Sequence, residues 1–136
     1  MKIKSKSEDE VLVQDGAEVQ IDGRRCWTLF DSGARNTYVV AAATTGLLGW
    51  AEPQPVQASL GGKVHHVSKG CMLIGTVENH VSETHARVVD DIGKDEKGRR
   101  IEILLGALAM QEWGIVLDLP KERLDFTHYP KEFVEF

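Results

Sequence analysis

Cysteine is scarce in this chain, which has only Cys26 and Cys71 among its 136 residues. Two thiols cannot build the disulfide framework of a small secreted protein, and no second cysteine pair is available for a zinc site. Both cysteines lie among apolar neighbours, in the segments RCWTLF and GCMLIG. We therefore expect two buried free thiols.

Long hydrophobic runs are also missing. The most apolar segments, YVVAAATTGLLGW and ILLGALAM, are interrupted by glycine or threonine and fall short of the roughly 18 apolar residues that a membrane span needs. The lysines of the N-terminal segment MKIKSKSEDEVLVQDG are not followed by the apolar stretch of a signal peptide. The sequence predicts no membrane partner and a cytoplasmic location.

An excess of basic residues, which a nucleic-acid-binding protein would usually show, is absent as well. The chain carries 16 Lys and Arg against 21 Asp and Glu, for a formal net charge of -5, and we expect no nucleic-acid partner. The length fits a single domain over residues 1–136. We expect residues 1–9 to be flexible and the aromatic tail at 128–136 to pack at an interface with a partner.

The histidines do not form a metal-binding motif. His65, His66, His80 and His85 fall in predicted hairpins without an accompanying carboxylate cluster of recognisable spacing. Asp90 and neighbouring acidic residues lack the spacing of a calcium loop. We expect exposed hairpin histidines, no metal site and no other cofactor.

The sequence does contain many short β-rich segments separated by turn residues. Alternating apolar residues flank a turn at Asp22-Gly23, and a second hairpin is predicted around Gly61-Gly62. A third hairpin should turn at Asn79-His80, and residues 93–100 should form a charged, mobile loop. This pattern favours a mostly-β barrel or sandwich.

One short helix is expected near the end of the chain. The segment GALAMQEW should be helical, with Leu108 and Trp113 on its buried side and Gly114 as its C-terminal stop. A strand in IEILL precedes it, and strands in IVLDL and RLDF follow it.

The segment LFDSGA places Asp31 directly after an apolar strand. Asp, Ser and Gly all form turns, so Asp31 can be a simple turn residue. The alternative is chemical: two carboxylates that share one proton can activate a water as base and protonate a carbonyl oxygen as acid. Ser32 would hold such a loop through its hydroxyl group, Gly33 would allow close approach of backbone, and the small Ala34 would not crowd the carboxylate. A nucleophilic role for Ser32 is not favoured, because the Gly-x-Ser-x-Gly elbow is lacking.

Three segments, in order, resemble the retropepsin-like aspartic proteases, a family that includes retroviral proteases and a similar domain of eukaryotic ubiquitin-shuttle proteins. WTLFDSGARNTYV looks like the active-site strand and loop, and VQASLGGKVHHV lies where the family has its flap. IEILLGALAMQEWGIVLDLPKERLDF looks like the closing segment, so the resemblance covers about residues 10 to 127. It implies a small closed β-barrel of the acid-protease type, with one short C-terminal helix and a flap hairpin.

The resemblance also implies a function that needs two chains. Pepsin-like enzymes carry two Asp-Ser/Thr-Gly loops in one chain, whereas Asp31 begins the only such sequence here. The implied enzyme is a homodimeric endopeptidase in which each subunit contributes Asp31, and Ser32 bonds across to the other loop. The flap tip, formed by Leu60, Gly61, Gly62 and Lys63, would close over an extended peptide.

The chain departs from the retroviral pattern at two places. Arg35-Asn36 follows the active-site loop where many retroviral members have acidic residues, and Ala107 follows Gly106 where they have arginine. The ion pair of those members cannot form here in the same way. This difference motivates an alternative function, a peptide-binding module with the protease fold and little or no catalytic activity.

Overall fold

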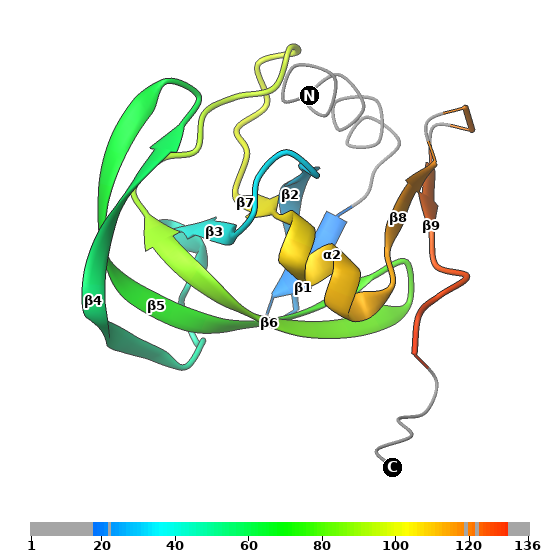
Figure 1. The fold of residues 1–136 in the computed structure, drawn as a ribbon, viewed down its shortest axis with the longest axis horizontal. Helices are drawn as coiled ribbons and strands as arrows, with labels where there is room; N and C mark the ends of the chain where they lie inside the picture. The colour runs from blue at the N-terminus through cyan, green and yellow to red at the C-terminus, as the bar shows by residue number, and fades with distance from the viewer. Residues whose placement is uncertain (1–17, 22, 119, 122, 131–136) are drawn as a thin grey trace.

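The computed structural model describes residues 18–21, 23–118, 120–121 and 123–130. Our expectations for residues 1–9, and for the tail beyond residue 130, lie outside these ranges. In chain order, the elements are β1 (Glu18–Ile21), β2 (Arg24–Phe30), β3 (Thr37–Val40), the short 3-10 helix η1 (Ala41–Ala43), β4 (Gly49–Leu60), β5 (Lys63–Val77), β6 (His80–Val89), β7 (Ile103–Leu105), α2 (Ala107–Trp113), β8 (Val116–Asp118) and β9 (Arg123–Asp125) (Figure 1).

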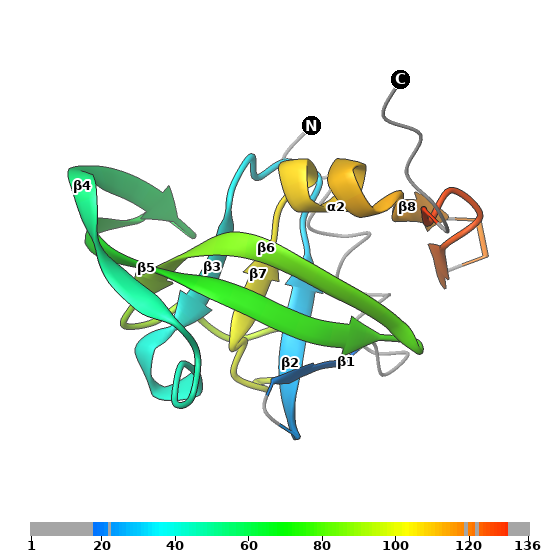
Figure 2. The same cartoon turned by 90° about the horizontal axis from the view of Figure 1, so that it is seen from below.

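The described residues are mostly strand, as predicted. Seven strands form one sheet in the order β1-β2-β7-β3-β6-β5-β4, and β8 and β9 form a separate pair. In Figure 2, α2 lies along one side of this sheet, and the β8–β9 pair stands beyond the end of the helix. No helix in the described ranges is long and apolar enough to cross a membrane.

The predicted closed barrel is wrong in this structure. β1 meets β5 at one register pair only, Gln20 with Thr76, whereas β4 continues as an outer strand beyond β5. The sheet therefore curls without closing. Strand periodicity reports which residues pair well in a sheet, but it carries no information on how far the two ends of that sheet approach each other.

The first two predicted hairpins are present. β1 pairs with β2 on either side of Gly23, and β4 pairs with β5 so that Leu60 lies opposite Lys63. Gly61 and Gly62 form the tip between them with φ angles of 57° and 82°. These left-handed conformations explain why two glycines stand at the tip of this hairpin.

The third hairpin turns one residue earlier than the sequence indicated. Val77 pairs with His80, so Glu78 and Asn79 form the turn, with φ angles of 46° and 67°. The sequence predicted Asn79-His80 as the turn. Asn79 instead takes the second position, and Glu78 is forced into a conformation that it rarely adopts.

The helix α2 begins one residue later than expected, because Gly106 is its extended N-cap, and it ends where expected, with Gly114 as a left-handed C-cap at φ 67°. Its buried face differs from the prediction, because Ala109 and Met110 are buried whereas Leu108 is 47% exposed. Trp113 does pack against the core, as predicted. Trp113 follows Ala109 by four residues and Met110 by three, so these three share one face, and Leu108 lies on another.

The charged loop at residues 93–100 is held by one carboxylate. Asp95 accepts hydrogen bonds from the backbone N–H groups of Lys97 and Arg99 at 2.9 and 2.8 Å, and from the buried indole Nε1 of Trp27 at 2.9 Å. The Arg99 guanidinium lies 3.7 Å from the centroid of the Trp27 ring. The loop expected to be mobile is thus attached to the core by a tryptophan far away in the sequence.

Candidate active site

Asp31 lies at the end of β2 and is 7% exposed. Its backbone N–H donates to the carbonyl oxygen of Leu105 at 3.0 Å, which extends the parallel pairing of β2 with β7 by one bond. Its Oδ1 accepts the backbone N–H of Gly33 at 2.8 Å. Asp31 is therefore both a turn residue and a buried carboxylate whose orientation is fixed by a backbone donor.

The loop after Asp31 is anchored on the first turn of α2. The N–H of Ala107 donates to the carbonyl oxygen of Ala34 at 2.7 Å, and the N–H of Leu108 donates to that of Arg35 at 3.1 Å. These donors belong to the group that every helix leaves unpaired at its N-terminus. The helix thus positions the loop, and the loop carbonyl oxygens accept hydrogen bonds from N–H groups of the first helical turn.

Gly106 permits this close contact. A Cβ atom at this position would lie 2.2 Å from the carbonyl oxygen of Asn36 and 2.9 Å from that of Ala34. Its N–H donates to the buried Oγ1 of Thr37 at 3.1 Å. Since both obstructing atoms belong to the backbone, only glycine fits between strand β7 and the helix.

A cavity of about 240 Å³ joins the Asp31 loop to the β4–β5 hairpin. Of the residues that the sequence singled out, five line it: Asp31, Gly33, Ala34, Leu60 and Gly61. Ser32 is exposed beside this lining, and Gly62 also lies outside it. Lys63 lines a different cavity, of about 400 Å³, on the β5 strand.

Sequence reasoning missed half of the lining. Arg35, Asn36, Tyr38, Ser59 and Leu104 complete the cavity. Tyr38 and Leu104 are a register pair between β3 and β7, so only knowledge of strand order would have placed them there. Arg35 and Asn36 were noted for their departure from a pattern, which is a signal that they lie near the site but not that they line it.

The charges of this cavity are few. Among the described residues that line it, Asp31 is the one carboxylate and Arg35 the one cation. A single carboxylate cannot share a proton with a second one in the manner of an acid–base pair. A catalytic pair at this place therefore needs a carboxylate from outside the described lining of this cavity.

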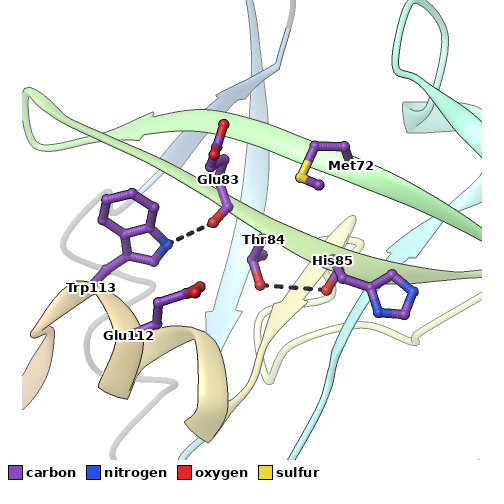
Figure 3. Close-up of a pocket in the computed structure, with 6 residues that line it drawn as sticks. All are labelled: Met72, Glu83, Thr84, His85, Glu112 and Trp113. Atoms are coloured by element: carbon purple, nitrogen blue, oxygen red, sulfur yellow. Dashed lines mark hydrogen bonds between the residues drawn. The ribbon is translucent and has the colours of Figure 1, made fainter. Parts of the chain in front are cut away.

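A cavity of about 300 Å³ between β5, β6 and the end of α2 is lined by Glu83, His85 and Glu112, among others. Figure 3 shows the Trp113 indole donating to the Glu83 carbonyl oxygen, a contact of 2.7 Å that fixes the helix end to β6. Trp113 and Glu83 both line this cavity, so the contact helps to hold part of its wall in place.

The histidines have separate surroundings. His66 and His85 are exposed as expected, but His65 is only 9% exposed. His80 stacks on Phe126 at 4.0 Å between ring centroids, and His85 lies 2.7 Å from Glu52 Oε1. Within the described ranges, no three His, Cys, Asp or Glu side chains come together as metal ligands.

Both cysteines are buried and form no disulfide with each other, as the sequence indicated. Burial raises the pKa of the Cys71 thiol to about 11. At such a pKa the thiolate is a very minor species near neutral pH, so Cys71 is not an activated nucleophile.

Comparisons with known proteins place this fold. No protein-family model matches the chain, and no curated protein matches it significantly in sequence. Among solved structures, it is similar to the retroviral protease-like domain of Ddi1 from Leishmania major, with a TM-score of 0.59 and 13% identity, over 82% of this chain and 86% of that one. A foamy viral protease-reverse transcriptase bound to an RNA/DNA hybrid is a looser match, with a TM-score of 0.47 and 12% identity, over 71% of this chain and 11% of that one.

Proposed function

Because this chain has the retropepsin-like fold, we propose that it is an aspartic-type endopeptidase whose active site forms when two copies bring their Asp31 side chains together. The observation that carries the proposal is the position of Asp31. It is a buried carboxylate at a strand end, oriented by a backbone N–H, and it lines a cavity together with the tip of a hairpin.

The proposed chemistry requires that the two Asp31 carboxylates share one proton. Like charges in such proximity repel, so one member of the pair is ionised while the other keeps its proton. The ionised member takes a proton from water as the water attacks the peptide carbonyl carbon. The protonated member donates to the carbonyl oxygen, which gives a tetrahedral intermediate. Collapse of this intermediate, with a proton passed to the amine, breaks the C–N bond.

The second carboxylate is proposed to come from a second copy. Asp31 is the single acidic residue in the described lining of its cavity, and a two-fold axis beside the loop would bring an identical carboxylate to it. Ser32, which is exposed next to Asp31, is proposed to bond across to the partner loop.

The β4–β5 hairpin is proposed to act as the flap. Leu60 and Gly61 line the same cavity as Asp31, and the left-handed Gly61 and Gly62 allow the tip to bend without strain. An extended peptide held beneath it would pair with main-chain groups as an added strand, and its side chains would enter pockets on alternating sides.

Cleavage of an unbiased peptide library tests this function. The wild-type protein is expected to cut internal peptide bonds, and the Asp31→Asn variant is expected to cut none while it keeps the wild-type sedimentation profile. Equal cleavage by the variant would remove Asp31 from the chemistry. Binding of peptides without cleavage by either protein would support the peptide-binding module instead. The cytoplasmic location stays a prediction, which cell fractionation would test.

A further inference from the structure

Arg35 brings an unpaired positive charge to the cavity that holds Asp31. Its side chain is exposed and belongs to the cavity lining. Ion pairs join His85 to Glu52, Arg100 to Asp91 and Arg123 to Asp118, and Arg35 is in none of these pairs. Within the described ranges, therefore, no carboxylate neutralises Arg35, and its guanidinium is available to a ligand.

The base of this side chain is rigid. The Arg35 carbonyl oxygen accepts the N–H of Leu108 at 3.1 Å, and the preceding carbonyl of Ala34 accepts that of Ala107 at 2.7 Å. The guanidinium therefore extends from a fixed point of the loop that also orients Asp31. A donor on a rigid base loses less freedom when it binds a ligand, which favours selectivity.

The charge of the proposed catalytic pair means that Arg35 affects which substrate side chains are preferred. Two carboxylates that share one proton carry one negative charge, which repels an acidic substrate side chain held nearby. Arg35 offers a planar fork of donors that fits a carboxylate in two parallel hydrogen bonds. Arg35 thus favours an acidic substrate side chain, whereas the negative charge of the catalytic pair alone would disfavour one.

Two lysines of the flap strand β5 add positive charge beside a second cavity. Lys63 and Lys69 line the cavity of about 400 Å³ on β5, together with His65 and His66, and Asp90 is the acidic member among the described lining residues. Two lysines against one carboxylate in this lining contrast with the net charge of -5 for the whole chain. They provide a local field that attracts acidic peptides toward the flap.

We propose that Arg35 determines substrate specificity by pairing with an aspartate or glutamate side chain of the peptide. The inference rests on the proposed function, since it assigns a substrate class to the same site. In a two-fold dimer each subunit contributes one Arg35, so acidic residues are favoured at positions on both sides of the cleaved bond.

The test compares matched peptides that differ at one position, with Glu, Gln or Lys. For wild type, kcat/KM is expected to be at least about tenfold higher with Glu than with Gln, the size of one charge-assisted contact. Arg35→Glu should reverse the preference toward Lys, and Arg35→Lys should retain part of the preference for Glu. The matched control is Arg25→Glu, which changes an exposed arginine of β2 outside the cavity lining and should leave the preference unchanged.

Binding measurements separate this inference from the proposed function. The same peptides, labelled with fluorescein, are titrated with the Asp31→Asn protein with and without Arg35→Glu. Cleavage by wild type without any charge preference would overturn the role of Arg35 and leave the endopeptidase in place. Arg35-dependent binding of the Glu peptide without cleavage would support Arg35 and overturn the endopeptidase. Neither binding nor cleavage would overturn both.

Discussion

The N–H of Ala107 donates to the carbonyl oxygen of Ala34 at 2.7 Å, so the helix α2 and the loop after Asp31 form one unit. This contact joins two segments more than 70 residues apart in the sequence. It requires Gly106, because any side chain there would strike the backbone of residues 34 and 36. The stability of the fold and the geometry of the site therefore depend on the same glycine.

Gly106→Ala should lower the free energy of unfolding by about 3 kcal/mol, since an added methyl group must displace rigid backbone. The measurement is urea denaturation followed by tryptophan fluorescence. Gly49→Ala is the matched control, because a Cβ there would lie 3.4 Å from the nearest atom, the carbonyl oxygen of Gly70. The control should shift stability by no more than about 0.5 kcal/mol, and an equally mild Gly106→Ala would contradict the proposed contact.

Asp95 should make the fold sensitive to acid. Burial acts to raise the pKa of Asp95, but hydrogen bonds from Arg99, Trp27 and Lys97, together with the charge of Arg99, lower it below its ordinary value. A lowered folded-state pKa stabilises the protein above the unfolded pKa of about 3.9, and this stabilisation is lost as the pH falls through the folded pKa.

We therefore expect the stability difference between wild type and Asp95→Asn to shrink as the pH falls from about 5 to about 2. Urea midpoints of both proteins at each pH measure this difference. The pKa of Asp125 is also lowered, chiefly by the hydroxyl group of Thr127. Because Asp125 is present in both proteins, its contribution to stability cancels in the difference. A difference that stays constant over this range would show that the bonds of Asp95 do not favour its ionised form.

The two thiols should be inert in the folded protein. Cys26 and Cys71 are 0% and 1% exposed, and a pKa of about 11 for Cys71 leaves about one thiol in a thousand ionised at pH 8. A chromogenic disulfide reagent should label both cysteines at once in urea and at least about a hundredfold more slowly in buffer. Rapid labelling of the folded protein would contradict the burial of these residues.

Local patterns predicted most of the elements, because turns and helix ends depend on neighbours in the chain. Gly61-Gly62 and Gly114 mark a hairpin tip and a helix end as expected, since each takes a left-handed conformation. The wrong predictions concern features that depend on contacts between segments far apart in the sequence. The burial of Ala109 and Met110 in place of Leu108 depends on how α2 meets the sheet, and the open sheet depends on the approach of β1 to β5.

The residues of the candidate site also fall into two groups, those that local motifs predict and those that strand order brings together. Asp31 and the tip of the β4–β5 hairpin stand out in short motifs, whereas Tyr38 and Leu104 reach the cavity only through the pairing of β3 with β7. The hydrogen bond from Trp27 to Asp95 was likewise invisible in the sequence, because it links positions 68 residues apart. Side chains brought together by strand order cannot be read from spacing along the chain.

Subunit mixing tests the central claim, that two chains each supply one Asp31, most directly. Wild-type protein is mixed with a ninefold excess of Asp31→Asn under conditions that allow the subunits to exchange, and peptide cleavage is measured per wild-type chain. If pairing is random and both carboxylates are required, activity should fall to about one tenth of that of wild type alone. The same excess of Gly49→Ala should leave it undiminished. Unchanged activity in the presence of excess Asp31→Asn would contradict the account, because it would mean that one Asp31 is sufficient.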